Sequence, residues 1–91
     1  MPLCELATSR RIVGGRQVRR AIEDNVLVKI FVARDADPRL VAPLIEEAGR
    51  KSIPVEWVET MVLLGRASAI DRGASVAGIR VRSEEPRDIK D

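Results

Sequence analysis

The feature that most constrains the fold is a nearly continuous apolar run from Val26 to Ala33, in which Lys29 is the only charged residue. A strand with one wet face would alternate apolar and polar residues, whereas an unbroken run rich in Val and Ile is typical of a strand buried on both faces. Other elements must then cover both sides of the sheet. We expect Lys29 to lie near one end or edge.

Helical patterns alternate with short β-branched segments along the rest of the chain, which is typical of an α/β domain. Asp37 and Pro38 suit the start of a helix to about residue 52, which Pro43 should make irregular or divide in two. Thr60 is expected to cap a helix through residue 69. The other predicted elements are helices over 3–9 and from 16 to about 25, where Asn25 can take the left-handed turn, and strands over 12–13, 55–58 and 75–81.

Side-chain patterns assign residues to the core of these elements. In the helix that follows Asp37, the residues expected to face the core are Leu40, Val41, Leu44, Ile45 and Ala48. Trp57 should cover a face of the sheet. Gly78 lies inside the last strand and suggests a bulge or a close backbone approach.

Length and charge predict one basic domain. The 91 residues suffice for a single modest core, so we expect one domain over 1–82 and a polar, disordered tail over 83–91. The net charge is +2, but the tail holds four acids and two bases, which leaves +4 for the preceding residues. A basic body is compatible with phosphate binding.

Composition excludes several classes of site. The chain has no histidine and one cysteine, which rules out histidine catalysis, histidine metal sites and an internal disulfide. Two aromatic rings cannot make a platform for stacked RNA bases. Asp35 and Asp37 resemble an Asp-x-Asp cation motif, but they lack further ligands and helix capping explains Asp37. We expect no cofactor, no metal and no enzymatic activity, and a cytoplasmic protein, because no apolar run has membrane-spanning length.

Five arginines between positions 10 and 20 surround a Gly14-Gly15 pair that begins a helix. In this helix Arg16, Gln17 and Arg20 share one face, and the opposite, apolar face consists of Val18, Ala21 and Ile22. A glycine-started helix with a cationic first turn suits a polyanion such as nucleic acid. The alternative is an ordinary surface helix with solvated arginines. The spacing matches neither a dinucleotide fingerprint nor a P-loop.

Three segments in register resemble one family. The runs Ile12–Ile22, Val32–Pro38 and Val58–Met61, the last followed by Leu64–Ala67, are similar to the kink-turn RNA-binding ribosomal proteins of the L-seven-Ae type, and most of all to small bacterial YbxF-type members. The resemblance spans nearly all of residues 9–81. It implies a three-layer α/β/α sandwich around a four-stranded mixed sheet.

The resemblance also implies a function, the binding of the kink-turn, a sharply bent RNA duplex with tandem sheared G·A pairs. The glycine-arginine motif would contact those pairs, Asp37 would lie beside an extruded nucleotide, and a loop from Ile70 to Arg72 would cover bases next to the bend, near Met61. The RNA-binding residues implied are Gly14, Gly15, Arg16, Gln17, Arg20, Asp37, Met61, Ile70, Asp71 and Arg72.

The motif departs from the wider family at a few positions. Arg16, Gln17 and Arg20 stand where Asn, Glu and Lys are common, although bacterial relatives also carry a basic residue followed by Gln. Gly73 replaces a frequent proline. From the resemblance we expect a monomeric protein that binds structured RNA, with ribosomal RNA as one candidate. The alternative is a protein-interaction adaptor on the same fold.

Overall fold

The computed structural model describes residues 6, 8, 10–70 and 72–81. Of the helix predicted over 3–9, only positions 6 and 8 are described, and the tail at 83–91 lies outside the described residues. Within the described ranges, no helix has the length and apolar character needed to cross a membrane.

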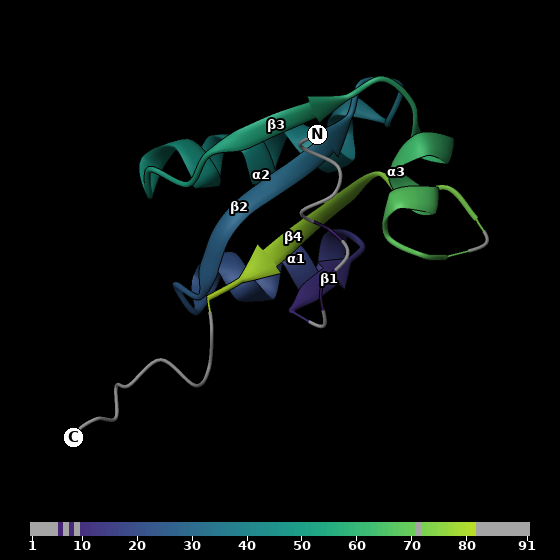
Figure 1. Ribbon diagram of the computed structural model, residues 1–91. Coiled ribbons are helices and arrows are strands. Elements are labelled where there is room, and N and C mark those ends of the chain that lie inside the picture. The colour runs from purple at the N-terminus through teal and green to yellow at the C-terminus, as the bar shows by residue number, and fades with distance from the viewer. Residues whose placement is uncertain (1–5, 7, 9, 71, 82–91) are drawn as a thin grey trace.

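The described residues form a four-stranded mixed sheet (Figure 1). The strands are β1 (Arg11–Val13), β2 (Leu27–Ala33), β3 (Val55–Val58) and β4 (Val76–Arg80), in the spatial order β1-β4-β2-β3. β2 runs parallel to β3 and antiparallel to β4, which also pairs antiparallel with β1.

Three helices complete the α/β/α sandwich predicted from the sequence. The helices are α1 (Gly15–Glu23), α2 (Pro38–Arg50) and α3 (Met61–Ala67). In the view of Figure 1, α1 and α2 lie behind the sheet, while α3 lies nearer the viewer and contacts β2, β3 and β4. The predicted fold class is thereby confirmed.

The central strand β2 is buried as its sequence predicts. Ile30, Phe31 and Val32 have no exposed surface, and because they alternate in direction both faces of the strand are covered. Val28 is the exception at 48% exposure, since the register with β4 shifts between Leu27 and Lys29 and leaves Val28 as an extra residue. Lys29 lies near the start of β2, as expected, and its Nζ is 3.4 Å from Oε1 of Glu56.

Local signals at the helix ends are confirmed. The Asp37 carboxylate accepts from the backbone N–H of Arg39 at 2.9 Å, and the Thr60 hydroxyl accepts from that of Leu63 at 3.1 Å. Asn25, after the end of α1, has φ 58°, in the left-handed region. α3 ends two residues earlier than predicted, because Ala69 adopts φ 63° and leaves the helical conformation.

Two expectations for α2 are wrong. The helix is continuous through Pro43, because the missing N–H only frees the carbonyl of Arg39, an exposed residue where water can take its place. Leu40 is 44% exposed and not a core residue. It lies against Gly15, so that the two helices approach each other at their first turns.

The expectations for Gly78 and Trp57 are each met only in part. A β-carbon at position 78 would lie 3.0 Å from Cδ2 of Leu27 and 3.4 Å from the Lys29 carbonyl oxygen, so the tight approach is that of a side chain, and the bulge is on β2. Trp57 lies on the edge strand β3 and is 43% exposed, so it covers its sheet face only in part. The Arg34 guanidinium lies 5.4 Å from its ring centroid.

The Thr60 cap yields a stability prediction. Thr60→Ala removes the acceptor for the Leu63 N–H, and we expect the free energy of unfolding to fall by about 1 kcal/mol. Urea unfolding followed by circular dichroism measures the change. Thr60→Ser keeps the hydroxyl and should retain most of the stability; equal losses in both variants would contradict a capping role.

Candidate nucleic-acid interface

The functional segments meet at one end of the sheet, where β1, β2 and β3 end and β4 begins. The Gly14 N–H donates to the Val76 carbonyl at 2.9 Å, and the Ala33 N–H donates to the Ser75 carbonyl at 2.9 Å. The glycine turn before α1 and the loop before β4 therefore lie on adjacent strands. The start of β4, to which the loop from Ile70 to Gly73 leads, thus lies next to the glycine turn at this end of the sheet.

Met61 links the same end of the sheet to α3. Its backbone N–H donates to Oδ1 of Asp35 at 2.8 Å, and its carbonyl accepts from the Ala74 N–H at 3.0 Å. Asp35 thus ties the β2–α2 connection to the start of α3, a role that the sequence reasoning missed because it considered Asp35 only as a metal ligand. Within the described ranges, no group of three or more carboxylates or thiols could hold a metal.

The start of α1 differs from those of the other two described helices. Gly14, with φ 105°, accepts from the Val18 N–H in the first helical bond but supplies no side-chain cap. Asp37 and Thr60 cap α2 and α3. The first backbone N–H groups of a helix have no acceptor within it. The uncapped start of α1 therefore presents donors and positive charge to an anion.

One face of α1 carries the predicted polar side chains. Arg16, Gln17 and Arg20 line a groove of about 400 Å³ beside the sheet. Arg20 extends into solvent with 80% of its side chain exposed, and its Nε lies 3.7 Å from the Asp24 carboxylate. The opposite face, with Val18, Ala21 and Ile22, is buried. The predicted division of α1 into a polar and an apolar face is confirmed.

The start of α2 lies beside the start of α1. A β-carbon at Gly15 would be 3.1 Å from Cδ1 of Leu40, so only glycine lets this leucine approach without adjustment. Leu40 is one helical turn after Asp37. The guanidinium and backbone N–H of Arg39 bond the Asp37 carboxylate and hold its pKa below the ordinary value. Asp37 is thus an ionised, exposed group near the glycine turn.

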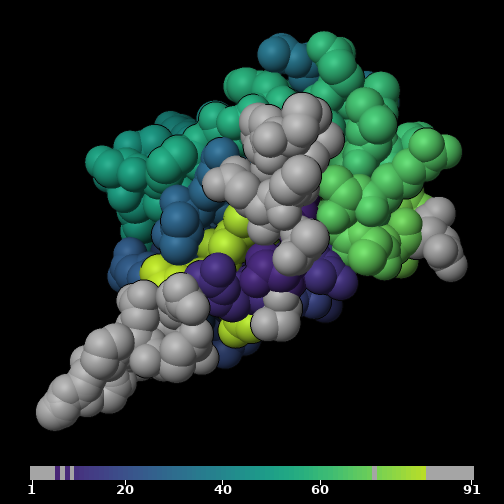
Figure 2. Space-filling view, viewed as in Figure 1, coloured from purple at the N-terminus to yellow at the C-terminus, as the bar shows by residue number. Residues whose placement is uncertain are grey.

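The loop before β4 folds back on α3 because of a glycine that the sequence reasoning did not select. A β-carbon at Gly65 would overlap the carbonyl oxygen of Arg72, and the Gly65 carbonyl accepts from the Ile70 N–H at 3.0 Å. In Figure 2, α3 forms the green surface at the right of the molecule. Arg72 is exposed and Ile70 packs partly against the core, while Asp71 lies outside the described residues.

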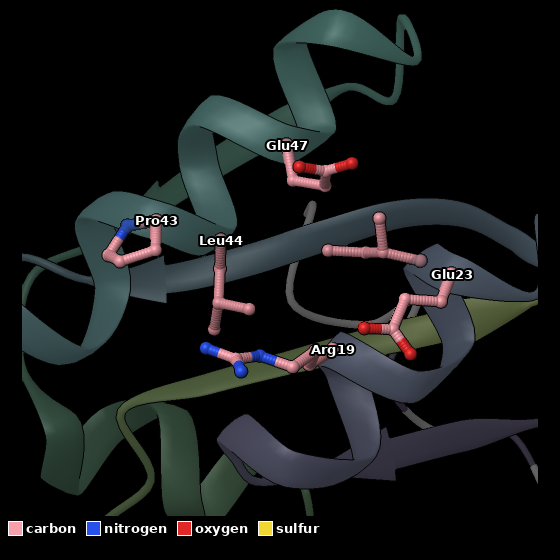
Figure 3. Close-up of a pocket in the computed structure, with 6 residues that line it drawn as sticks. Arg19, Glu23, Pro43, Leu44 and Glu47 are labelled. Carbon is pink, nitrogen blue, oxygen red and sulfur yellow. The ribbon is translucent and has the colours of Figure 1, made fainter.

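The hollow between α1 and α2 is less suited to a polyanion. It measures about 250 Å³, and Figure 3 shows Arg19 and Glu23 from α1 opposite Leu44 and Glu47 from α2. Two carboxylates against one guanidinium would repel phosphate. The sheet end and the outer face of α1 remain the candidate nucleic-acid interface.

Comparisons with known proteins show that the chain is similar to RNA-binding and ribosomal proteins. The chain is 33% identical over 69 residues to an RNA-binding protein of Halalkalibacterium halodurans, covering 76% of this chain and 84% of the other. It is 30% identical over 74 residues to RNA-binding protein YbxF of Geobacillus stearothermophilus, covering 81% and 90%. It is 33% identical over 79 residues to the large ribosomal subunit protein eL8 of Halobacterium salinarum, covering 86% and 66%.

Solved structures share the fold. The 15.5kD RNA binding protein of Giardia lamblia superposes with a TM-score of 0.79 at 20% identity, covering 93% of this chain and 72% of the other. No model of a protein family matches the chain.

The Gly65 contact yields a prediction for the loop before β4. Gly65→Ala places a methyl group on the Arg72 carbonyl, so the loop must move, and we expect a loss of about 1–3 kcal/mol in the free energy of unfolding. Chemical unfolding measures the loss, and amide NMR shifts should change most around Arg72 to Ala74.

Gly49→Ala is the matched control. Gly49 also lies inside a helix, but a β-carbon there would meet nothing within 4 Å. The same substitution should raise stability by about 0.5–1 kcal/mol, because alanine loses less backbone entropy than glycine in a helix. A stability gain at Gly65 as well would show that the loop does not depend on this contact.

Proposed function

Because the chain belongs to the L-seven-Ae-like family of RNA-binding proteins as a YbxF-type member, we propose that it recognises and stabilises kink-turn RNA. The observation that carries the proposal is the convergence of the uncapped, cationic start of α1 and the loop before β4 at one end of the sheet. A bent duplex presents closely spaced phosphates beside distorted base pairs. This interface offers charge for the phosphates and polar groups for the base edges.

Phosphate neutralisation supplies most of the affinity in this proposal. Arg16 and Arg20 are exposed on the outer face of α1, and the free N–H groups at the start of the helix add donors. Each neutralised phosphate releases condensed counterions, so binding weakens as salt rises. The exposed ion pair of Arg20 with Asp24 is weak and can give way to a phosphate.

Recognition of the G·A pairs is assigned to Gln17 and the glycine turn. Gln17 is exposed at the start of α1, where its amide can both donate to and accept from base edges. Gly14 and Gly15 carry no side chains, which lets the RNA approach the backbone closely. A neutral amide replaces the glutamate common in the family, so discrimination here depends on hydrogen-bond geometry and not on charge.

The remaining contacts are assigned to the neighbouring segments. Asp37 would lie beside an extruded nucleotide, where its ionised carboxylate can accept from base amino groups. Ile70, Asp71 and Arg72 would cover the bases next to the bend, with Met61 supporting them. The sharp bend is unfavourable for the RNA alone, and the protein populates it by binding the bent state more tightly than the extended one.

The proposal includes the domain organisation, the oligomeric state and the location of the protein. We take residues 1–82 as one RNA-binding domain that acts as a monomer, without catalysis, in the cytoplasm. The RNA-binding names of the YbxF-type relatives and the ribosomal name of eL8 support an RNA partner, which includes ribosomal RNA.

The arginines of α1 provide the first functional test. Arg16→Ala and Arg20→Ala should each weaken kink-turn binding roughly tenfold and reduce the slope of log affinity against log salt by about 1, because each removes a phosphate contact. Gel-shift titrations at several salt concentrations measure both. Arg50→Ala, at the far end of α2, removes the same charge and should leave binding unchanged.

Gln17 tests recognition of the base pairs. Gln17→Ala should reduce the ratio of affinities for a kink-turn RNA and a G·A-disrupted control by about 1–3 kcal/mol, while leaving the salt slope intact. The same titrations give this ratio. If the wild-type protein binds both RNAs equally, kink-turn recognition is refuted.

A further inference from the structure

The groove on the outer face of α1 continues past the residues assigned to the bend. Its lining begins with Arg16 and Gln17 at the sheet end, passes Arg20, and ends at Asp24 and Arg80. Arg16 and Asp24 are eight residues apart, so this stretch of helix is about 12 Å long. The groove therefore leads away from the sheet end toward the opposite end of the molecule.

Arg80 marks the far end of this groove. It is the last residue of β4, whose first residue, Val76, accepts from Gly14 at the sheet end. Four steps along a strand cover about 14 Å. The Arg80 N–H donates to the Arg10 carbonyl at 3.1 Å, which fixes the position of its backbone beside β1, while its side chain is exposed. The backbone of a cationic residue thus lies at a defined distance from the start of α1.

The charge of the groove favours a polyanion along its length. Arg16, Arg20 and Arg80 line it together with a single carboxylate, Asp24, which leaves a net charge of +2. Asp24 lies 3.7 Å from Arg20, at the end of the helix where a carboxylate gains nothing from the helix dipole. Both side chains of this ion pair are exposed, so the pair is weak and all three arginines remain for a ligand.

The groove is apolar between its arginines. Between the arginines the groove is lined by Ile12, Ala21 and Val26, which can pack against sugars but offer no side-chain hydrogen bonds. Cations spaced along about 12–14 Å suit a nucleic-acid backbone, because its phosphates recur at regular intervals along each strand.

We propose that this groove binds the phosphate backbone of the RNA stem that continues beyond the bend, with Arg80 as its outermost contact. This inference rests on the proposed kink-turn function, since the bend sets where the stem begins. It adds a contact that bears no base specificity and lies outside the segments assigned to the G·A pairs. The protein would then sense the length of the stem as well as the bend.

The test compares RNAs with the same bend and different stems. One RNA has stems that end close to the bend, and two others have one or the other stem extended by a helical turn. The wild-type protein should bind one of the extended RNAs roughly tenfold more tightly than the short one, with a salt slope steeper by about 1. Arg80→Ala should abolish this gain and leave the affinity for the short RNA unchanged.

Arg50→Ala is the matched control, because it removes an exposed arginine from the far end of α2. It should keep the full gain. If the wild-type protein binds all three RNAs equally, or if Arg80→Ala keeps the gain, the groove proposal is overturned while kink-turn binding stands. If no RNA binds above a G·A-disrupted control, the proposed function itself fails. Binding of an acidic peptide in the groove with no effect of stem length would assign it to a protein partner instead.

Discussion

The burial of β2 on both faces is the constraint on which the rest of the structure depends. Ile30, Phe31 and Val32 have no contact with solvent, and burying each such side chain contributes about 1.5–3 kcal/mol. That stabilisation requires helices on both sides and strands on both edges of β2. Three strands consequently finish at one end of the sheet, and the connections that follow them must gather there. The candidate interface is a product of the topology as much as of its own residues.

The starts of the three helices differ in role: those of α2 and α3 contribute to stability, and that of α1 is assigned to binding. α2 and α3 start with side chains that satisfy their first N–H groups, whereas α1 starts with a glycine and places arginine where the helix dipole disfavours it. A local rule of helix stability is therefore broken at the position to which the RNA contacts are assigned, as is common at functional sites. The rigid sheet and the two capped helices offset the cost.

Features that depend on residues close together in the chain were predicted correctly from the sequence. The apolar run of β2, the Asp37 and Thr60 caps and the left-handed Asn25 depend on a few consecutive positions, and the structure confirms them. Predicting these local features requires no knowledge of contacts between distant residues. The layers and the order of the segments came from the family resemblance.

The error at Pro43 is local, but the other errors have a different cause, because they depend on residues far apart in the chain. Leu40 has helical spacing typical of a core residue, yet it is 44% exposed and packs against Gly15, which is 25 residues earlier in the chain. Val28 is exposed through a shift in pairing with β4. Glycine destabilises a helix, so Gly65 could have been singled out from the sequence. Its role is visible only in the structure, where the loop before β4 returns and the Arg72 carbonyl lies against it.

Main-chain hydrogen bonds hold the sheet end together. Gly14 is joined to Val76, Ala33 to Ser75 and Ala74 to Met61 through backbone N–H and carbonyl groups. Exchanging an exposed side chain beside these bonds leaves the donors and acceptors in place. The scaffold can thus accept new contact residues without being rebuilt, so that a change of RNA preference requires only substitutions at the surface.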